Sequence, residues 1–475
     1  MRTDRESPSP SRAHLVEEYT TSVRFATRAL LFIISLVIFF GTGELALRVI
    51  YRDAGKRTLG GPGGHSFEHL AVRDDLRGRF DIGPKTPGKK RIMILGDSIT
   101  WGQGVRNWQD VWPEQLAVRL EQAGRPHEMA VFAMPGRDIP DHVREMEKWG
   151  SQVKPDVFIY QWYVNDIEVA SARPNNARRW QMWAGHNTLR SHSYLYYFLD
   201  NRLATYLPQP DRSYVQYVLQ DFAPGSREWA EFERYFHELA TRARELAPIR
   251  LLIIYPQVPF RGTAPLQAIY DRVKSLASSH TLAIPPAAWV RFAGRMINRN
   301  DAPWGQGLQV STQTPGQLAP IFETGDYYMP AGPSEVTVKL CIDKPVIGAA
   351  GEGETADVGG IGFIELIDPA TNVSVAGSGL PHFLNKTGWQ EARVSLIVPD
   401  VGRRLRFRLR SARSGFTLGS IEIGVDYGFR VVDLTDALNT FDTHSSIFDA
   451  HPNERAHTIV AQRVFEALDQ AESAH

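Results

Sequence analysis

The stretch from residue 90 to residue 102 constrains this chain more than any other segment. It reads Lys-Arg-Ile-Met-Ile-Leu-Gly-Asp-Ser-Ile-Thr-Trp-Gly, so four apolar residues run directly into a Gly-Asp-Ser turn. A short apolar run followed by such a turn indicates a buried strand that leads into a helix. This geometry would expose the hydroxyl of Ser98 at the carboxyl edge of a sheet, close to helix N–H groups that stabilise developing negative charge.

The full stretch resembles the first block of the SGNH (GDSL-type) esterase family, whose nucleophile would be Ser98. Gly-Asp-Ser alone also fits an ordinary strand-to-helix turn, so the longer match carries the resemblance. It implies a flavodoxin-like three-layer α/β/α fold and hydrolysis or transfer of an ester-linked acyl group.

A serine of this kind needs a base, because a free hydroxyl is a poor nucleophile near neutral pH. The base of the family lies near the C-terminus, where this chain has Phe-Asp-Ala-His-Pro-Asn at 448–453. His451 is therefore the proposed base. The best-known family pattern has its aspartate three residues before the histidine, whereas Asp449 is only two before. Asp449 is the candidate that would orient the ring, and Asp442 is the reserve.

Two further family blocks should supply the oxyanion hole together with the N–H of Ser98. Gly136 follows a strand-like run and matches the glycine of the second block, whereas Asn165 matches the asparagine of the third. A backbone N–H and a side-chain amide can both donate to an oxyanion. A glycine needed only for backbone conformation and a structural turn asparagine are the alternatives.

The third block departs from the Gly-x-Asn-Asp pattern of the family. Tyr163 replaces the glycine, which predicts a narrower or reshaped pocket, and Asp166 is expected to hold the turn by hydrogen bonds. The segment 168–208, which follows at once, is extra to the family core. It predicts a lid or one wall of the substrate cleft, with a membrane-skimming helix as the alternative.

Charge balance and cysteine usage exclude several classes of site. The chain has 53 basic and 53 acidic residues and no Lys/Arg stripe in its globular part, so nucleic acid is not expected as a partner. Cys341 is the only cysteine, which excludes an intrachain disulfide and a cysteine-pair zinc site. The pair His65 and His69 is interpreted as chance spacing in a linker. We therefore expect no cofactor and no metal.

The uncharged apolar run that starts at residue 29 predicts a membrane anchor over 29–50, between a tail at 1–28 and a linker at 51–89. This length spans about 30 Å of hydrocarbon, and Glu44 and Arg48 near one end can snorkel. A signal peptide and a buried amphipathic helix are the alternatives. By analogy with anchored members of the family, we expect a single-pass protein of a bacterial inner membrane with a periplasmic catalytic domain.

Ser98 and His451 are about 350 residues apart, too far for a compact fold of this type. Alternating helical and strand patterns predict the first part of a hydrolase domain over 90–301, and 429–475 returns to it. Between them, 302–428 contains short alternating runs split by turn residues, which predict a β-sandwich. This insertion resembles jelly-roll carbohydrate-binding modules, so it is expected to bind glycan or to serve as a packing or partner-docking domain.

These features predict a membrane-anchored serine esterase that removes acetyl groups from a cell-envelope or exported polysaccharide, with an acylated glycan as its partner. An O-acetyltransferase that acts on an exopolysaccharide would carry the same triad and is the first alternative. A non-catalytic glycan-binding or scaffold protein is the second, because Tyr163 and the shifted aspartate fit a degenerate site. The sugar, the acyl group and the oligomeric state stay open.

Overall fold

The computed structural model describes residues 12–50, 84–105, 107–167, 188–189, 192–206, 214–257, 266–277, 279–311, 318–343, 362–380, 387–411, 415–438, 441–446 and 449–473. The chain divides into two compact units, one around the N-terminal helix and the other around a parallel sheet and an antiparallel sandwich. The linker histidines His65 and His69 and the first part of the predicted lid, 168–187, lie outside the described residues.

The first unit contains the long helix α1 (Arg12–Ile50). Its segment Thr27–Val49 is long and apolar enough to cross a membrane, and no part of that window is buried. A core helix of a soluble protein would be mostly buried, so this helix has the exposure expected of a membrane span. A signal sequence near an N-terminus has the same features.

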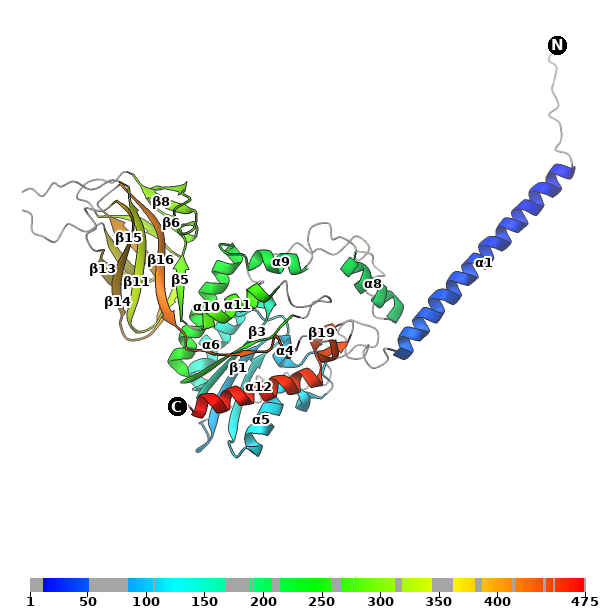
Figure 1. Ribbon diagram of the computed structural model, residues 1–475, viewed down its shortest axis with the longest axis horizontal. Helices are drawn as coiled ribbons and strands as arrows, with labels where there is room; N and C mark the ends of the chain where they lie inside the picture. The colour runs from blue at the N-terminus through cyan, green and yellow to red at the C-terminus, as the bar shows by residue number, and fades with distance from the viewer. Residues whose placement is uncertain are drawn as a thin grey trace, which may run out of the picture. The chain divides into compact units, whose positions relative to one another are not determined.

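Glu44 of α1 binds the N-terminus of α8 (Tyr194–Tyr206), another helix of this unit. Figure 1 shows α8 beside the C-terminal end of α1. Its carboxylate accepts hydrogen bonds from Ser193 Oγ at 2.8 Å and from the next two backbone N–H groups at 3.1 and 2.8 Å. Arg48 Nε donates to the same carboxylate at 2.7 Å. Free N–H groups at a helix N-terminus favour a negative charge. The predicted lid region therefore contains a helix that is attached to the predicted anchor.

Replacing Glu44 with alanine is expected to loosen the N-terminus of α8. Hydrogen bonds to a charged group contribute about 1.5–3 kcal/mol each, so amide hydrogen exchange over the first turn of α8 should become about tenfold faster or more. Hydrogen–deuterium exchange of the detergent-solubilised protein measures this. Leu45→Ala is the control, because Leu45 is 64% exposed on the same helix. Unchanged exchange in Glu44→Ala would contradict the docking role.

The second unit contains a five-stranded parallel sheet. Its order is β17 (Arg430–Asp433), β4 (Ile249–Ile254), β3 (Val157–Trp162), β1 (Lys90–Gly96) and β2 (His127–Ala133). Counted along the chain this is 2-1-3-4-5, the order of flavodoxin-like doubly wound sheets. The α/β arrangement expected from the sequence is thus present, and the predicted strand before Ser98 is β1, which lies between β3 and the edge strand β2.

Helices cover both faces of this sheet, which explains why its strands are apolar on both sides. One face carries α6 (Ile139–Val153), α9 (Tyr214–Asp221), α10 (Arg227–Leu246) and α11 (Gln267–Ala277), and the other carries α5 (Trp112–Gln122) and α12 (Glu454–Ser473) (Figure 1). On β1, Met93 and Leu95 belong to the first core, whereas Ile92 and Ile94 belong to the second. The three layers therefore follow from simple alternation along each strand.

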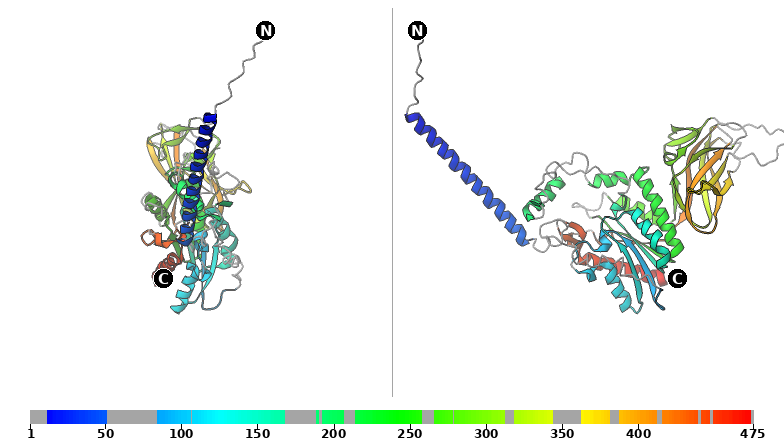
Figure 2. Two further views of the ribbon diagram at one scale, coloured as in Figure 1. Left: turned by 90° about the vertical axis from the view of Figure 1, so that its right-hand side faces the viewer. Right: turned by 180° about the vertical axis from the view of Figure 1, so that it is seen from behind.

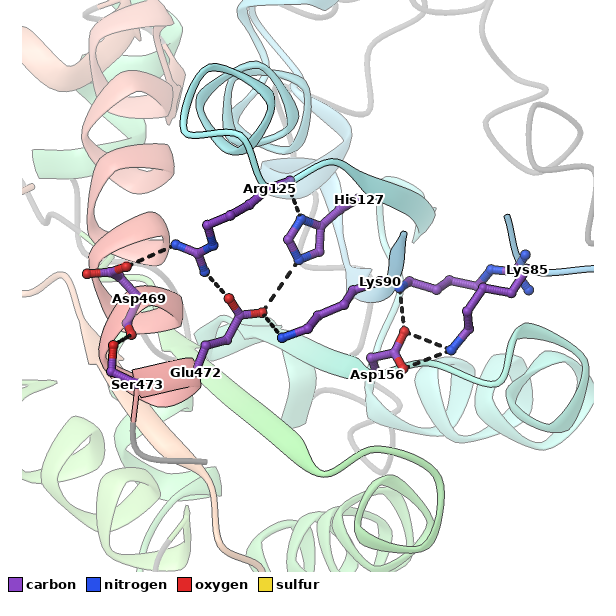
Figure 3. Close-up of polar contacts among 9 residues, drawn as sticks. Lys85, Lys90, Arg125, His127, Asp156, Asp469, Glu472 and Ser473 are labelled. Atoms are coloured by element: carbon purple, nitrogen blue, oxygen red, sulfur yellow. Dashed lines mark hydrogen bonds and ion pairs between the residues drawn. The ribbon is translucent and has the colours of Figure 1, made fainter. Parts of the chain in front are cut away.

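A polar network ties the end of α12 to the first two strands of the sheet (Figure 3). The Glu472 carboxylate contacts Lys90 Nζ at 2.8 Å and also binds the Arg125 guanidinium. Nearby, Asp156 contacts Lys85 Nζ at 2.8 Å just before β3 begins. These ion pairs join segments from both ends of the second unit, so they help to fix the C-terminal helix against the sheet.

The antiparallel part is a sandwich of two sheets, seen in the right-hand view of Figure 2. One sheet contains β6 (Val290–Arg291), β9 (Ala319–Glu323), β10 (Tyr327–Met329), β12 (Phe363–Ile367), β13 (Ser374–Gly379) and β15 (Arg403–Ser411). The other contains β5 (Ser279–Ile284), β7 (Arg295–Asn298), β8 (Gln306–Val310), β11 (Gly332–Ile342), β14 (Gly388–Val398) and β16 (Phe416–Asp426). Their inward side chains, such as Val336, Leu366 and Phe407, form a separate core.

The strands of the sandwich begin upstream of the expected boundary at residue 302. β5 follows α11 as the next strand of an α/β alternation would, yet it pairs with β16, with Ile284 opposite Ile421. The short strands β6 and β7 also belong to the sandwich sheets. The sequence of β5 does not reveal this partner, because its local pattern is the same in either sheet.

Buried polar contacts attach the sandwich to α10. His237 of α10 is 1% exposed, and its Nε2 lies 2.7 Å from the Tyr328 carbonyl oxygen. Its Nδ1 lies 3.0 Å from the hydroxyl of Tyr427. At the next residue of α10, the Glu238 carboxylate accepts a hydrogen bond from Arg404 Nε at 3.0 Å. Because such buried groups are costly to leave unpaired, these contacts hold the two parts of the second unit together.

Candidate active site

The predicted site residues follow three neighbouring parallel strands. Gly96 at the end of β1 is in register with Ala133 of β2, and Leu95 is in register with Tyr160 of β3. The turns after these strands therefore lie at one edge of the sheet, which is where open α/β sheets bind ligands. These turns carry Ser98, Gly136 and Asn165.

The structure brings Ser98 and His451 into hydrogen-bond distance. Ser98 is the first residue of α4 (Ser98–Trp101) and is 7% exposed. His451 lies in β19 (Asp449–Pro452), which pairs with β18 (His444–Ser446) in a two-stranded sheet. Its Nε2 is 3.0 Å from Ser98 Oγ. This separation is suitable for transfer of the serine proton to the imidazole.

The turn that carries Ser98 is held by buried side chains. Asp97 caps it, because Asp97 Oδ1 accepts a hydrogen bond from the backbone N–H of Ile99 at 2.9 Å. Thr100 Oγ1 donates to Gln161 Oε1 on β3 at 2.9 Å and accepts from Trp112 Nε1 on α5 at 3.3 Å. Sequence reasoning missed Gln161. A polar residue inside an apolar strand run was the available signal, since buried polar groups need partners.

Asp97 has an unusual electrostatic environment. Its side chain is 1% exposed, and burial, reinforced by the nearby Asp166 carboxylate, raises the pKa of Asp97 to about 6. The hydrogen bond from Ile99 and the nearby imidazole of His451 act in the opposite direction but do not cancel the effect of burial. Asp97 therefore keeps its proton to a higher pH than an ordinary aspartate.

This shift predicts that Asp97 destabilises the fold at neutral pH. The unfolded carboxyl has a pKa of about 4, so it loses its proton first, and the free energy of unfolding should fall as the pH rises from about 4 to about 6 and then level off. Two pKa units correspond to about 2–3 kcal/mol. Asp97→Asn is expected to abolish this decrease in the free energy of unfolding. It should therefore raise the melting temperature at pH 7.5 but not at pH 4.

Melting temperatures of the detergent-solubilised protein between pH 4 and pH 7.5 measure the effect. The matched control is Asp436→Asn, which changes an exposed carboxylate in a turn of the same unit. Equal melting temperatures for the parent and Asp97→Asn at pH 7.5 would contradict the raised pKa of Asp97.

Gly136 and Asn165 lie in the turns after β2 and β3. Gly136 is exposed and has a φ of 76°, a conformation that favours glycine over other residues. Asn165 lies in a 3-10 turn, η3 (Val164–Ile167), and is half-buried. The hydroxyl of Tyr163, which replaces the family glycine, donates to Gln257 Oε1 at 2.9 Å. This side chain is thus directed to the segment after β4.

Of the two aspartate candidates for the triad, the structure describes the side chain of Asp442 but not that of Asp449. β19 begins at Asp449, but the Asp449 side chain is not among the described parts of the chain, so its orienting role stays a prediction. Asp442, the reserve candidate, is exposed, and its carboxylate accepts from Arg455 Nη1 at 2.5 Å.

A second histidine near the site, His457 of α12, has a structural contact. Its Nδ1 accepts a hydrogen bond from the backbone N–H of Trp112 at 3.1 Å. Burial, with a smaller contribution from His451, lowers the pKa of His457 to about 3, so it stays neutral as this contact requires. Within the described residues, no group of three or more His, Cys, Asp or Glu side chains is placed to hold a metal ion.

No family model and no curated protein matches this chain. Similar solved structures include TesA, which is 15% identical with a TM-score of 0.25 over 40% of this chain and 73% of TesA. A catalytic mutant of an acetylxylan esterase from Geobacillus stearothermophilus is 14% identical, with a TM-score of 0.25 over 41% and 74%. A carbohydrate-binding module from Cellvibrio mixtus lichenase 5A is 9% identical, with a TM-score of 0.22 over 30% and 95%. TM-scores this low leave the family open.

Proposed function

We propose that this chain is an SGNH-type serine esterase that removes acetyl groups from a cell-envelope or exported polysaccharide. The observation that carries the proposal is the 3.0 Å separation of Ser98 Oγ and His451 Nε2 at the carboxyl edge of a parallel sheet. A nucleophile within reach of a base is the arrangement that acyl transfer to serine needs. Two potential oxyanion donors, Gly136 and Asn165, follow the neighbouring strands at the same edge.

In the acylation half of the proposed reaction, His451 Nε2 takes the hydroxyl proton while Ser98 Oγ attacks the ester carbonyl carbon. The carbonyl oxygen becomes an oxyanion that accepts hydrogen bonds from the N–H groups of Ser98 and Gly136 and from Asn165 Nδ2. The intermediate then collapses as the bond to the sugar oxygen breaks. His451 returns its proton to that oxygen, so the sugar hydroxyl leaves and the acetyl group stays on Ser98.

Deacylation repeats these steps with water in place of the serine. His451 takes a proton from a water molecule, and the resulting hydroxide oxygen attacks the acetyl carbon. The oxyanion forms in the same hole, and its collapse breaks the bond to Ser98 Oγ, which recovers its proton from His451. Acetate is released. Asp449 is proposed to hold the imidazole of His451 in the orientation that both halves need.

We also propose that α1 is an uncleaved anchor that holds the catalytic unit on the periplasmic side of a bacterial inner membrane. The exposed apolar surface of Thr27–Val49 supports an anchor, because exposed hydrocarbon of this extent is stable in a bilayer. In this setting the sandwich would bind the glycan whose acetyl groups are removed.

Chemical labelling combined with acetate release tests the proposed function. The full chain in detergent is treated with a serine-directed phosphonate, and a single adduct on Ser98 is expected by mass spectrometry. Acetylated xylan serves as the polysaccharide probe, and release of acetate supports the esterase. Transfer of acetyl to an added glycan well above the rate of hydrolysis would favour the O-acetyltransferase. An absence of both labelling and hydrolysis would refute the serine mechanism.

A further inference from the structure

One buried histidine next to the site takes no part in the proposed reaction. His142 lies in the first turn of α6 and is completely buried. Its Nε2 is 3.5 Å from Oδ1 of Asp166, which is 1% exposed. The imidazole also packs edge-on against Tyr160, with ring centroids 5.3 Å apart. Placing an imidazole and a carboxylate together in the interior costs free energy, because both groups lose their contacts with water.

The other carboxylate oxygen of Asp166 is fixed by two donors. Asp166 Oδ2 accepts from the Tyr160 hydroxyl at 2.9 Å and from the backbone N–H of Tyr163 at 3.0 Å. Burial and the Asp166 charge keep the pKa of Tyr160 far above its usual range, so its hydroxyl stays a donor. Among these three groups, only His142 lies beside Oδ1, and its Nε2 contacts that oxygen at 3.5 Å without forming a hydrogen bond.

Asn165 is the residue before Asp166 in η3. The Asn165 Oδ1 atom is buried and accepts no hydrogen bond from the parts of the chain that the structure describes. The direction of its amide is therefore set by the backbone of η3. Asp166 is the next residue in that turn and ties it to β3 and to Tyr163. A displaced Asp166 would move Asn165 with it.

We propose that His142 is a positioning residue that acts through Asp166 to place Asn165 Nδ2 at the oxyanion. The inference rests on the proposed esterase function and adds to it a residue from α6, outside the sequence segments that resemble the family. Oxyanion donors act at about 2.7–3.1 Å, and a misplacement of about 1 Å can cost about 10²-fold in rate. An imidazole that only fills space would be replaceable by a leucine of similar volume.

The first test replaces His142 with leucine and measures the hydrolysis of 4-nitrophenyl acetate by the full chain in detergent. We expect kcat to fall about tenfold or more, which is part of the 10²–10³-fold effect of losing one oxyanion donor, while KM stays within about twofold. His142→Gln should recover most of the activity, because its amide keeps an N–H within reach of Asp166. His237→Leu is the matched control, since His237 is equally buried at the sandwich, and its kcat should not change.

The second test is a double-mutant cycle with Asn165→Ala. If His142 acts through Asn165, His142→Leu should lower kcat less than about twofold once the amide is absent. An equal loss in both backgrounds would overturn the inference, because the histidine would then act by another route. Where His142→Leu fails to fold, Tyr160→Phe replaces it in the cycle, since it removes only the hydroxyl bond to Asp166.

The outcomes separate this inference from the proposed function. A folded His142→Leu variant with the kcat of the parent overturns the positioning role and leaves the esterase intact. A parent that neither hydrolyses the acetate nor forms the Ser98 adduct overturns the proposed function, and the positioning role falls with it. A loss of kcat that Asn165→Ala masks supports both.

Discussion

Replacing Ser98 with alanine is expected to lower kcat for 4-nitrophenyl acetate by about 10⁴- to 10⁶-fold, the loss that follows removal of a serine nucleophile acting with its base. Alanine has no hydroxyl that can be acylated. It therefore cannot replace Ser98 Oγ, which lies 3.0 Å from His451 Nε2. The measurement is steady-state hydrolysis by the full chain in detergent. KM and the melting temperature should change little, because the side chain is small and the turn is capped by Asp97.

The same assay applied to His451→Ala and to the double variant sharpens this result. Two groups that act as a unit give non-additive losses, so the double variant should be about as inactive as Ser98→Ala alone. Ser473→Ala is the matched control, since this serine lies at the far end of α12, where its hydroxyl binds only the helix backbone through Asp469. Retained activity in Ser98→Ala would exclude the proposed nucleophile.

The second large effect is expected at Asn165. Asn165→Ala should lower kcat by about 10²- to 10³-fold, equivalent to about 2.7–4 kcal/mol of transition-state stabilisation, because one donor to the oxyanion is lost. KM should stay nearly constant, since this hydrogen bond strengthens only as the oxyanion forms. Asn165→Asp should be at least as impaired, because a carboxylate repels the same charge.

Rates of reaction with a phosphonate add a second measurement for Asn165, because the phosphonate oxygen occupies the oxyanion hole of the adduct. The rate should fall in parallel with kcat. Asn107→Ala is the control, because Asn107 Nδ2 donates to the Asp110 carboxylate in an exposed turn. A kcat of Asn165→Ala within about threefold of the parent would mean that this amide does not bind the oxyanion.

Local patterns in the sequence predicted much of the fold. The apolar run before Ser98 forms β1, and the helical patterns expected within 90–301 include α10, whose start is fixed by Ser226 as N-cap. The alternating runs after residue 302 lie in β11, β12, β14, β15 and β16. These elements are encoded by neighbours along the chain, through side-chain alternation and capping, so their positions can be read without tertiary information.

Other features depend on partners that are distant in sequence. β5 lies within 90–301, which the sequence assigns to the hydrolase domain, because nothing in its six residues identifies β16 as its partner. Gln161 and His142 were missed for the same reason, because their significance comes from Thr100 and Asp166. The resemblance to family blocks could place Ser98 and His451 in one site, since it carries long-range information that periodicity lacks. The role of Asp449 stays a prediction.

The insertion of the sandwich has a consequence for biosynthesis. All of its strands are translated after Ser98 and before His451, so the nucleophile of a growing chain has no base until the sandwich has been made. The face of the sheet that contains Ile92 and Ile94 of β1 is likewise covered only in part, by α5, until α12 has been made. Nascent chains are therefore expected to be unreactive toward esters and to need a chaperone for this uncovered face. Activity would arise only in molecules whose sandwich is already complete.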